Sequence, residues 1–230
     1  MLTRRALMAA VPALGFAAPP LWRPKDPSKP HEWVFCQDVA LDPEDPKKLV
    51  AKSPGKGPVM FNSNAKTQDW VTTRTWGDAD LTIDFCIAKG SNSGVYLHGL
   101  YEAQIFDSYG TPVEKLETKD CGSIYHRWID NKPVGGSVAK VNASLAPGQW
   151  QRYHIVFRAP RFDKSGRKTE NARFVRVELN GQLVQENVEV DGCTRACLEI
   201  PEAPKNPIML QGDHGPVAFR NFVCKEIRLR

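Results

Sequence analysis

The sequence predicts an all-β fold, an antiparallel two-sheet sandwich of the jelly-roll type. Residues 81–87 alternate between apolar and polar side chains, the pattern of a half-buried strand, and residues 149–158 alternate in the same way. Asn180-Gly181, placed between two apolar runs, is the most specific β-hairpin signal in the chain. No ten-residue helical pattern competes with these strands. We therefore expect a jelly roll whose last strands return to pair centrally.

Residues 1–18 indicate an export signal, because Arg4 and Arg5 precede a short apolar stretch from Ala6 to Ala18. The paired arginines suggest the twin-arginine route, and small residues at the end of the stretch suit cleavage. The stretch is too short for a stable membrane anchor. We expect an exported protein, periplasmic or extracellular; the alternative is an N-terminus that is never processed.

The rest of the chain divides into an arm and one domain. Residues 19–58 are rich in proline and lysine and show little periodicity, which predicts a linker followed by an irregular arm on the surface. Residues 59–230 carry the predicted strands and are long enough for one sizeable core. We expect this second part to be a single β-sandwich domain.

The charge pattern argues against nucleic acid as a partner. The net charge is +5, but 31 Lys and Arg are interleaved with 26 Asp and Glu along the whole sequence. Nucleic-acid-binding domains commonly concentrate basic residues in a patch or stripe, and none is present here. The sequence does not predict an oligomeric state.

The segment 92–110 is the strongest candidate for a functional surface. It predicts two short strands joined at residues 99 and 100, with apolar side chains on one face and polar ones on the other. Antiparallel sheets often leave one face in water, but such a face usually carries Lys, Thr and Ser. The polar face of this segment could therefore be either a solvent-exposed sheet surface or a functional site. The residues expected on this polar face are Tyr96, His98, Glu102 and Gln104.

The long segment 111–148 contains few apolar residues and many Gly, Pro, Asp and Lys. Loops of this length are usually functional lids or disordered excursions. A short apolar stretch at residues 121–126 interrupts it, so we expect an ordered loop close to the site.

The six cysteines fit an exported protein. Cys193 and Cys197 are close enough in sequence to close a small loop, and the other four could form two more bridges. Six cysteines allow fifteen pairings, so the sequence does not choose between them. Zinc is less expected, because no pair has two-residue spacing and no histidine lies beside a pair. The other four cysteines are Cys36, Cys86, Cys121 and Cys224.

A series of blocks between about residues 62 and 227 resembles the 3-keto-disaccharide hydrolase domain family, which is built on a concanavalin-like sandwich. The blocks occur in the family's order, and the ordered set is more specific than any one of them. They are Trp76-Gly77-Asp78, Asn92-Ser93-Gly94-Val95-Tyr96-Leu97, Tyr101-Glu102-Ala103-Gln104-Ile105-Phe106-Asp107-Ser108, Gly122-Ser123-Ile124-Tyr125, Pro147-Gly148-Gln149-Trp150-Gln151, residues 155–163, Leu179-Asn180-Gly181, and Pro207-Ile208-Met209-Leu210-Gln211 through Phe219-Arg220-Asn221-Phe222.

The chain departs from the family pattern in three places. His98 stands where the family typically has arginine. Asp213 and His214 stand where the family has a His-bearing turn, with slightly different spacing. The excursion that carries Cys193 and Cys197 is unusual. These departures bear on the substrate more than on the fold.

The resemblance implies hydrolysis of a glycoside whose sugar carries a ketone at carbon 3, or elimination followed by hydration. The chemistry is sensible, because such a ketone acidifies the neighbouring C2 proton and a modest general base can then remove it. The group at C1 leaves by elimination. The site needs a base, a donor or metal near the ketone oxygen, and an acid for the leaving oxygen. A carbohydrate is the implied partner.

Candidate residues for these roles lie in the resembling blocks. Glu102 is our first choice for the base, and His98 and His214 are the other candidates for base and acid. A divalent metal ion held by Glu102 with His98 or His214 would also stabilise the enolate, although no tight ligand motif requires one. The candidates for substrate binding are Asn92, Tyr96, Gln104, Asp107, Tyr125, Gln211 and Arg220.

Several alternatives remain open at this point. Arg220 could pair with Glu102 or Asp107 as a structural bridge, and Asn92 could simply begin a turn. The chain could be a non-catalytic carbohydrate-binding module, because fold alone does not decide function. A conventional retaining glycosidase would need two carboxylates about 5 Å apart, whereas strict alternation puts Glu102 and Asp107 on opposite faces.

Overall fold

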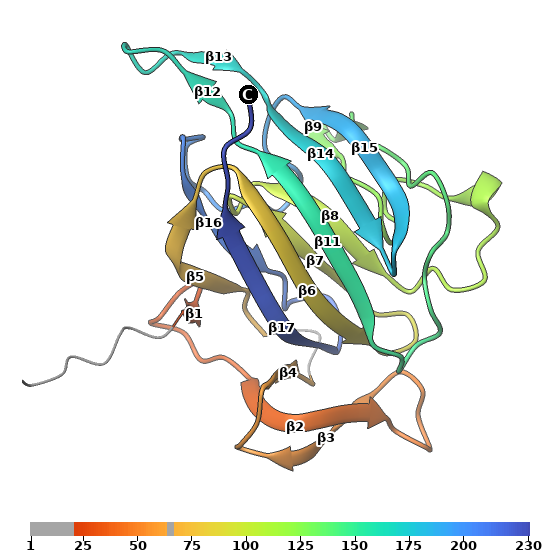
Figure 1. The fold of residues 1–230 in the computed structure, drawn as a ribbon. Coiled ribbons are helices and arrows are strands. Elements are labelled where there is room, and N and C mark those ends of the chain that lie inside the picture. Colours follow the sequence, from red (N-terminus) through yellow and green to blue (C-terminus); the bar gives the residue numbers. More distant parts are fainter. Residues whose placement is uncertain (1–20, 64–66) are drawn as a thin grey trace, which may run out of the picture.

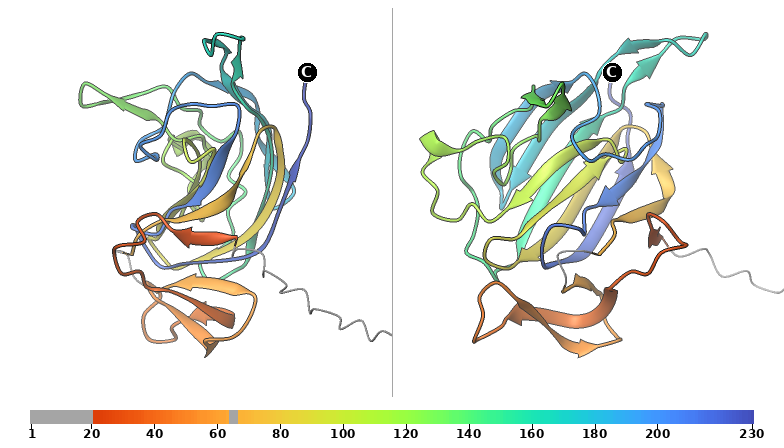
Figure 2. Two further views of the ribbon diagram at one scale, coloured as in Figure 1. Left: turned by 90° about the vertical axis from the view of Figure 1, so that its left-hand side faces the viewer. Right: turned by 180° about the vertical axis from the view of Figure 1, so that it is seen from behind.

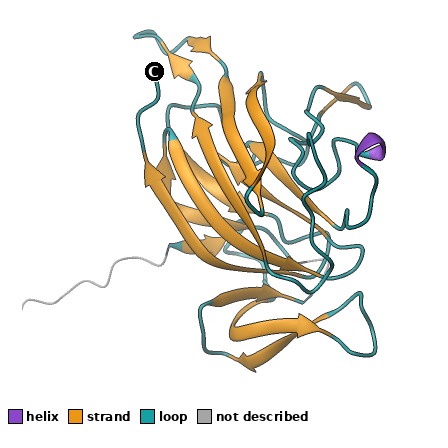
Figure 3. Ribbon diagram, turned by 45° about the vertical axis from the view of Figure 1, so that its right-hand side comes forward, coloured by secondary structure: helices purple, strands orange, loops and turns teal. Residues whose placement is uncertain are grey.

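A computed structural model describes residues 21–63 and 67–230, and the regular secondary structure in these residues is almost entirely β-strand, joined by long loops (Figure 3). The expected export signal lies outside the described residues and stays a prediction. In the described part, no helix is long and apolar enough to cross a membrane. One short 3-10 helix, η1 (Val113–Lys115), lies on the long loop.

Two antiparallel sheets pack face to face, which confirms the predicted sandwich (Figures 1 and 2). The five-stranded sheet consists, in spatial order, of β1 (Trp22–Pro24), β5 (Trp70–Trp76), β16 (Asn206–Leu210), β7 (Asn92–Leu97) and β8 (Tyr101–Phe106). The eight-stranded sheet consists of β15 (Gln182–Val190), β14 (Ala172–Leu179), β11 (Gln151–Arg158), β6 (Ala79–Ile87), β17 (Val217–Glu226), β4 (Val59–Asn62), β2 (Trp33–Leu41) and β3 (Leu49–Pro54). Two small hairpins are formed by β9 (Arg127–Ile129) with β10 (Lys132–Val134), and by β12 (Arg161–Phe162) with β13 (Lys168–Glu170).

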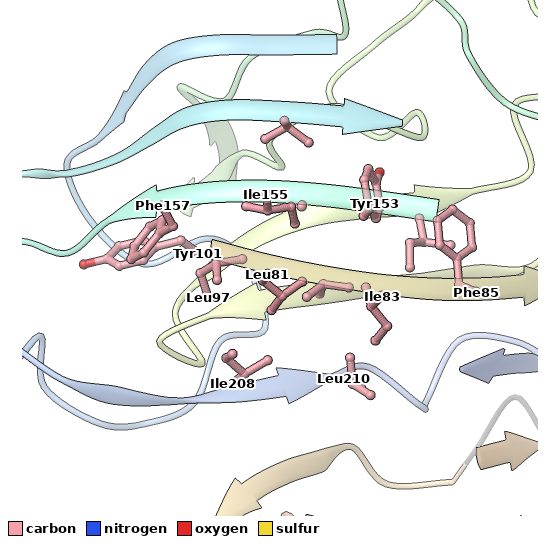
Figure 4. Packing of buried hydrophobic residues seen from close by; sticks show 14 of the residues in the cluster. Leu81, Ile83, Phe85, Leu97, Tyr101, Tyr153, Ile155, Phe157, Ile208 and Leu210 are labelled. Carbon is pink, nitrogen blue, oxygen red and sulfur yellow. The ribbon is translucent and has the colours of Figure 1, made fainter. Parts of the chain in front are cut away.

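The core lies between the two sheets and follows from the two-residue period of the strands. Leu81, Ile83 and Phe85 of β6 point inward and are fully buried. They pack against inward residues of the other sheet, such as Leu97 and Leu210 (Figure 4). Each such side chain contributes about 1.5–3 kcal/mol when it is fully buried. The core therefore fixes which face of each strand points outward.

The predicted arm is part of the sandwich. β1 pairs with β5 at the edge of the five-stranded sheet, and β2 pairs with both β3 and β4 in the eight-stranded sheet. The expectation of an irregular arm over residues 19–58 is therefore wrong where the segment forms β1, β2 and β3. The many prolines of this segment are typical of irregular structure. Proline is, however, tolerated at sheet edges and strand ends, and Pro24 and Pro54 each end a strand.

The last two long strands lie inside the sheets, as expected for a jelly roll. β16 pairs with β5 on one side and β7 on the other, and β17 lies between β6 and β4. The connection between them, residues 211–216, is thereby held against the start of β7. This brings Gln211 and His214 beside the predicted hairpin.

Among the described residues, three hairpin turns have both central residues at positive φ, and one of them is the β9–β10 turn with Asp130 (φ 48°) and Asn131 (φ 59°). In the β14–β15 turn the central residues are Asn180 (φ 53°) and Gly181 (φ 78°), as the sequence predicts. In the β7–β8 turn they are His98 (φ 57°) and Gly99 (φ 66°). Because the backbone of His98 is in the left-handed region, its side chain does not follow the alternating inward and outward directions of the β7 side chains.

The long loop 111–148 is ordered and runs along β8. The amide of Gln104 donates to the Ser123 carbonyl oxygen at 2.9 Å, and the amide of Tyr125 donates to the Glu102 carbonyl oxygen at 3.1 Å. This part of the loop therefore extends the five-stranded sheet beyond β8. It lies next to the predicted site, as expected.

One disulfide is formed, between Cys193 and Cys197. The other four cysteines are free, so the two further bridges that the sequence allowed are not present. Three of the four, Cys36, Cys86 and Cys121, are buried, and Cys224 is half-buried. In the sandwich they act as small packing side chains.

Candidate active site

A cavity of about 400 Å³ opens on the outer face of the five-stranded sheet, the face turned away from the core. We call it the Glu102 cavity. It combines outward residues of β7 and β8, one residue of the long loop, two of the disulfide loop and two that follow β16. Its lining residues are Asn92, Tyr96, Glu102, Gln104, Tyr125, Arg195, Ala196, Gln211 and His214.

The strand register explains why these side chains meet. Tyr96 lies opposite Glu102, and Gly94 lies opposite Gln104, in the β7–β8 pair. Directly opposite residues of an antiparallel pair point to the same face. The amide of Gln211 donates to the Gly94 carbonyl oxygen at 3.0 Å, which places the end of β16 beside β7. Three neighbouring strands thus supply the floor of the cavity.

Glu102 is the most unusual group in the cavity. Glu102 is only 1% exposed, and its Oε2 atom has no hydrogen-bond partner among the described residues. Burial raises the pKa of this carboxyl well above its usual range, and the nearby negative charges of Asp213 and Asp69 raise it further. The neighbouring Tyr96 hydroxyl opposes these effects on the pKa. The result is a carboxylate with a high affinity for a proton.

Gly94 provides the space that the Glu102 side chain occupies. A Cβ atom at position 94 would lie 2.9 Å from both Cγ and Cδ of Glu102 and would overlap its Oε1 atom. Any side chain at this position would therefore displace the carboxyl group. The glycine of the Asn92-Ser93-Gly94 block is required by this contact, and its φ is not in the left-handed region.

Tyr96 connects Glu102 to the disulfide loop. Its hydroxyl donates to the backbone carbonyl oxygen of Arg195 at 3.1 Å. Burial, and after it the neighbouring Glu102, raises the pKa of this phenol well above its usual value, so it stays protonated. Tyr96 is therefore a neutral donor at the floor of the cavity.

Unpartnered acceptors gather in this cavity. Besides Glu102 Oε2, the side-chain oxygens Asn92 Oδ1 and Gln211 Oε1 are buried without a partner among the described residues. Buried polar atoms in proteins are nearly always hydrogen-bonded, so each exception calls for an explanation. Three of them around one cavity suit a ligand rich in hydroxyl donors.

His214 and Asp213 form a pair at the mouth of the cavity. Nδ1 of His214 lies 2.5 Å from Oδ1 of Asp213 and 3.4 Å from Nε2 of Gln211. A carboxylate beside Nδ1 keeps a proton on that nitrogen and leaves Nε2 for a ligand. The turn that carries the pair is held in place by a hydrogen bond that the Gly212 amide donates to the Asp69 carboxylate at 3.0 Å.

Gln104 and Asp107 have different surroundings. Gln104 lines the cavity, is 1% exposed, and accepts a hydrogen bond from the Ile105 amide through Oε1 at 3.0 Å. Asp107 does not line the cavity; its Oδ2 accepts from the Gly90 amide at 2.8 Å and fastens the loop before β7. The carboxylate pair that a retaining glycosidase would need is thus not made by Glu102 and Asp107.

His98 lies on the core side of the sheet and not with Glu102. Its ring is 1% exposed, lies 5.1 Å from the Phe157 ring, and has Nε2 at 3.2 Å from the Gly77 carbonyl oxygen. Burial lowers its pKa to about 4, so the ring is neutral. The expectation that His98 shares a surface with Glu102 and Gln104 is wrong, because the turn conformation reverses its side chain.

Arg220 lies on the outer face of the other sheet. It contacts Asp84 at 3.6 Å and Asp38 at 3.7 Å, and its guanidinium group stacks 3.9 Å from the centre of the Trp150 ring. It reaches neither Glu102 nor Asp107. The expectation that Arg220 binds substrate beside Glu102 is wrong, because β17 belongs to the eight-stranded sheet.

The disulfide loop contributes residues that the sequence reasoning missed. Arg195 and Ala196 lie between the two bonded cysteines and line the cavity. Thr194 fixes the loop: its amide donates to the Leu100 carbonyl oxygen at 2.9 Å, and its Oγ1 accepts from the Glu102 amide at 3.2 Å. The spacing of the cysteines indicated a closed loop, but not that the loop crosses the five-stranded sheet.

The described residues contain no group of three or more His, Cys, Asp or Glu side chains arranged to hold a metal ion. Of the possible ligands named from the sequence, Glu102 and His214 share the cavity and His98 does not.

The structure is thus a two-sheet β-sandwich with a buried carboxylate, Glu102, in a polar cavity on its surface. The chain belongs to the 3-keto-alpha-glucoside-1,2-lyase-like domain family, whose sequence model matches residues 23–225. This confirms the resemblance seen in the sequence. No curated protein sequence matches the chain.

Solved structures with the same fold come from Parabacteroides distasonis ATCC 8503. One protein, described as a "putative glycosyl hydrolase", is 28% identical with a TM-score of 0.58, over 74% of this chain and 72% of that chain. A second of the same description is 14% identical with a TM-score of 0.54, over 90% and 94%. A third is 20% identical with a TM-score of 0.53, over 90% and 99%. The last two show the fold alone.

Proposed function

We propose that this protein cleaves glycosides whose sugar carries a ketone at carbon 3, by removing the C2 proton and expelling the group at C1. The observation that carries the proposal is Glu102, a fully buried carboxylate with a free Oε2 atom in a polar cavity. Membership of the family supports the keto-sugar as substrate. The unpartnered acceptors of Asn92 and Gln211 suit its hydroxyl groups.

Glu102 acts as the base in the first step. The C2–H bond breaks, the proton passes to Glu102 Oε2, and the electron pair moves onto the oxygen of the C3 ketone to give an enolate. The re-forming carbonyl then drives the electron pair into a C1=C2 double bond as the C1–O bond breaks. Because burial raises the pKa of Glu102, its proton affinity is closer to that of the C2 carbanion than an exposed carboxylate would offer.

His214 supplies the proton to the leaving oxygen. Asp213 holds the ring through Nδ1, which leaves Nε2 to hand a proton to the leaving oxygen at the mouth of the cavity. Gln104 and Tyr125 also line the cavity and carry N–H and O–H donors for the enolate oxygen. Addition of water across the C1=C2 bond completes net hydrolysis.

The test is release of the leaving group from a 3-keto-glucoside, compared with the same glucoside without the ketone. We expect release only from the keto substrate, and a loss of about 10²–10⁴-fold in kcat with Glu102→Gln. Glu186→Gln is the matched control, because Glu186 is exposed on β15, outside the Glu102 cavity, and its ion pair in the described part of the chain is with Lys140, at 3.0 Å. Repeating the assay with a chelator tests whether a metal ion assists the enolate.

Two outcomes would contradict the proposal. Equal release from both substrates would indicate ordinary glycoside hydrolysis. No release from either, together with sugar binding that Glu102→Gln changes only modestly, would leave a carbohydrate-binding module.

A further inference from the structure

A second cavity of about 590 Å³ lies on the same outer face of the five-stranded sheet. We call it the Val71 cavity. Val71 and Thr73 of β5 form its floor, and Ile200 and Pro201, which follow the disulfide loop, form one wall. Its lining is largely apolar, in contrast to the Glu102 cavity.

One row of paired residues crosses the sheet beneath both cavities. Arg23 lies opposite Val71, Val71 opposite Met209, Met209 opposite Tyr96, and Tyr96 opposite Glu102. Val71 lines one cavity, and Tyr96 and Glu102 line the other. Met209, between them, lines neither and is fully buried. Val71 and Tyr96 are two strand spacings apart, roughly 10 Å.

Leu198 covers the middle of this row and separates the two cavities. It is 9% exposed and forms a distinct apolar cluster with Val71, Tyr96 and Met209 on the outer face of the sheet. Its side chain also fills the space where Gly99 lacks a side chain. A ligand that extends from Glu102 along the row therefore meets the Leu198 side chain before it reaches Val71.

The position of Leu198 is fixed by its neighbours in the chain. Its amide donates to the Gly99 carbonyl oxygen at 2.8 Å, and the Cys193–Cys197 disulfide closes the loop that directly precedes it. Thr194, inside that loop, is bonded to the Leu100 carbonyl oxygen at 2.9 Å. The separating wall is thus tied to the β7–β8 turn at two points.

From this arrangement we infer that Leu198 is a specificity-determining residue, which limits the leaving group to a size that fits the Glu102 cavity alone. The inference rests on the proposed function for the identity of the leaving group. Shortening Leu198 joins the two cavities. The joined groove then accepts an extended apolar leaving group, such as a biaryl, because Val71, Ile200 and Pro201 offer an apolar surface.

The experiment compares Leu198→Ala with the unaltered protein on two 3-keto-glucosides, one with a methyl and one with a biphenyl leaving group. We expect the ratio of kcat/KM, biphenyl over methyl, to rise about tenfold or more in Leu198→Ala, mainly through a lower KM. Leu49→Ala is the matched control, since Leu49 is 4% exposed and lies in β3, outside both cavities. An unchanged ratio in Leu198→Ala, or the same rise in Leu49→Ala, would overturn the inference.

A second measurement separates this inference from the proposed function. Binding of the two unoxidised glucosides, measured by calorimetry, needs no turnover. If the unaltered protein cleaves neither keto substrate but Leu198→Ala binds the biphenyl glucoside about tenfold more tightly, the proposed function fails and the size limit stands. If binding of both glucosides is the same in the two proteins, the size limit fails. If Leu198→Ala does not fold, Leu198→Val replaces it. This smaller truncation is expected to shift the same ratios in the same direction.

Discussion

The outer face of each sheet carries a buried carboxylate on one of its strands, but in the part of the chain that the structure describes only the one on the eight-stranded sheet is paired with a charged side chain. On the eight-stranded sheet, the buried Asp84 is bonded to Arg152 at 2.5 and 3.1 Å and to Asn221 at 2.8 Å. On the five-stranded sheet, Glu102 is even less exposed and forms no ion pair among the described residues. Both are carboxylates on strands with one face in the core.

The rest of the eight-stranded face repeats the pattern of Asp84. His154 lies between Asp80, at 3.0 Å, and Glu178, at 3.2 Å. Trp150 donates its indole N–H to Asp38 at 3.0 Å. The carboxylates Asp38, Asp80, Asp84 and Glu178 on this face therefore each have a polar or charged partner.

The pKa directions of the two carboxyl groups follow from this difference. Burial alone would raise the pKa of Asp84, but hydrogen bonds from Arg152 and Asn221 outweigh it and hold the pKa below its usual range. At Glu102, only the neighbouring Tyr96 hydroxyl opposes the effect of burial, and the pKa rises. A buried carboxylate that the protein itself has left unpaired is the one to expect in a reaction.

The largest effect that would sharpen this comparison is expected from Gly94→Ala. The added methyl group overlaps the Glu102 carboxyl and must displace it, so kcat/KM for the keto substrate should fall about 10–100-fold while the fold is retained. Steady-state kinetics with a circular dichroism spectrum would measure both. Full activity in Gly94→Ala would show that the position of the carboxyl group is not critical.

Asp84→Asn should give the converse result. It removes the charge that Arg152 and Arg220 share, so we expect a loss of about 1–3 kcal/mol in the free energy of unfolding, toward the lower end because Arg152 is 59% exposed. Activity per folded molecule should not change. Urea unfolding and turnover of the same sample measure the two quantities, and a fall in turnover without a fall in stability would break the comparison.

The third effect concerns how the stability of Glu102→Gln depends on pH. The folded pKa of Glu102 is raised, so its contribution to stability is fully present below the unfolded pKa, about 4.3, and is lost as pH rises through the folded value. Glutamine does not titrate. The free energy of unfolding of Glu102→Gln relative to the unaltered protein should therefore increase with pH over that window, by about 1.4 kcal/mol for each unit of the rise in pKa.

Unfolding curves collected across that pH range would show the trend. If the two proteins keep a constant difference in stability from pH 4 upward, Glu102 is not the raised carboxyl group.

Local patterns predicted the sandwich and the face of the hairpin that carries Glu102, because alternation and turn residues act within a few positions. They did not predict His98, whose direction depends on the φ angle of one turn residue. They also put Arg220 among the residues near Glu102, since strand pairing between distant segments leaves no local signal. Arg195 and Leu198 were missed for the same reason: the path of their loop over the sheet is a long-range property.

The central positions of β16 and β17 have a consequence for synthesis. Each of these strands lies between partners made much earlier: β16 between β5 and β7, and β17 between β6 and β4. Until residues 206–226 leave the ribosome, both sheets remain split, with unpaired strand edges exposed. Such long-range pairing folds slowly and is prone to aggregation on the way. A stop codon before residue 206 is therefore expected to abolish the whole sandwich and not merely to shorten it.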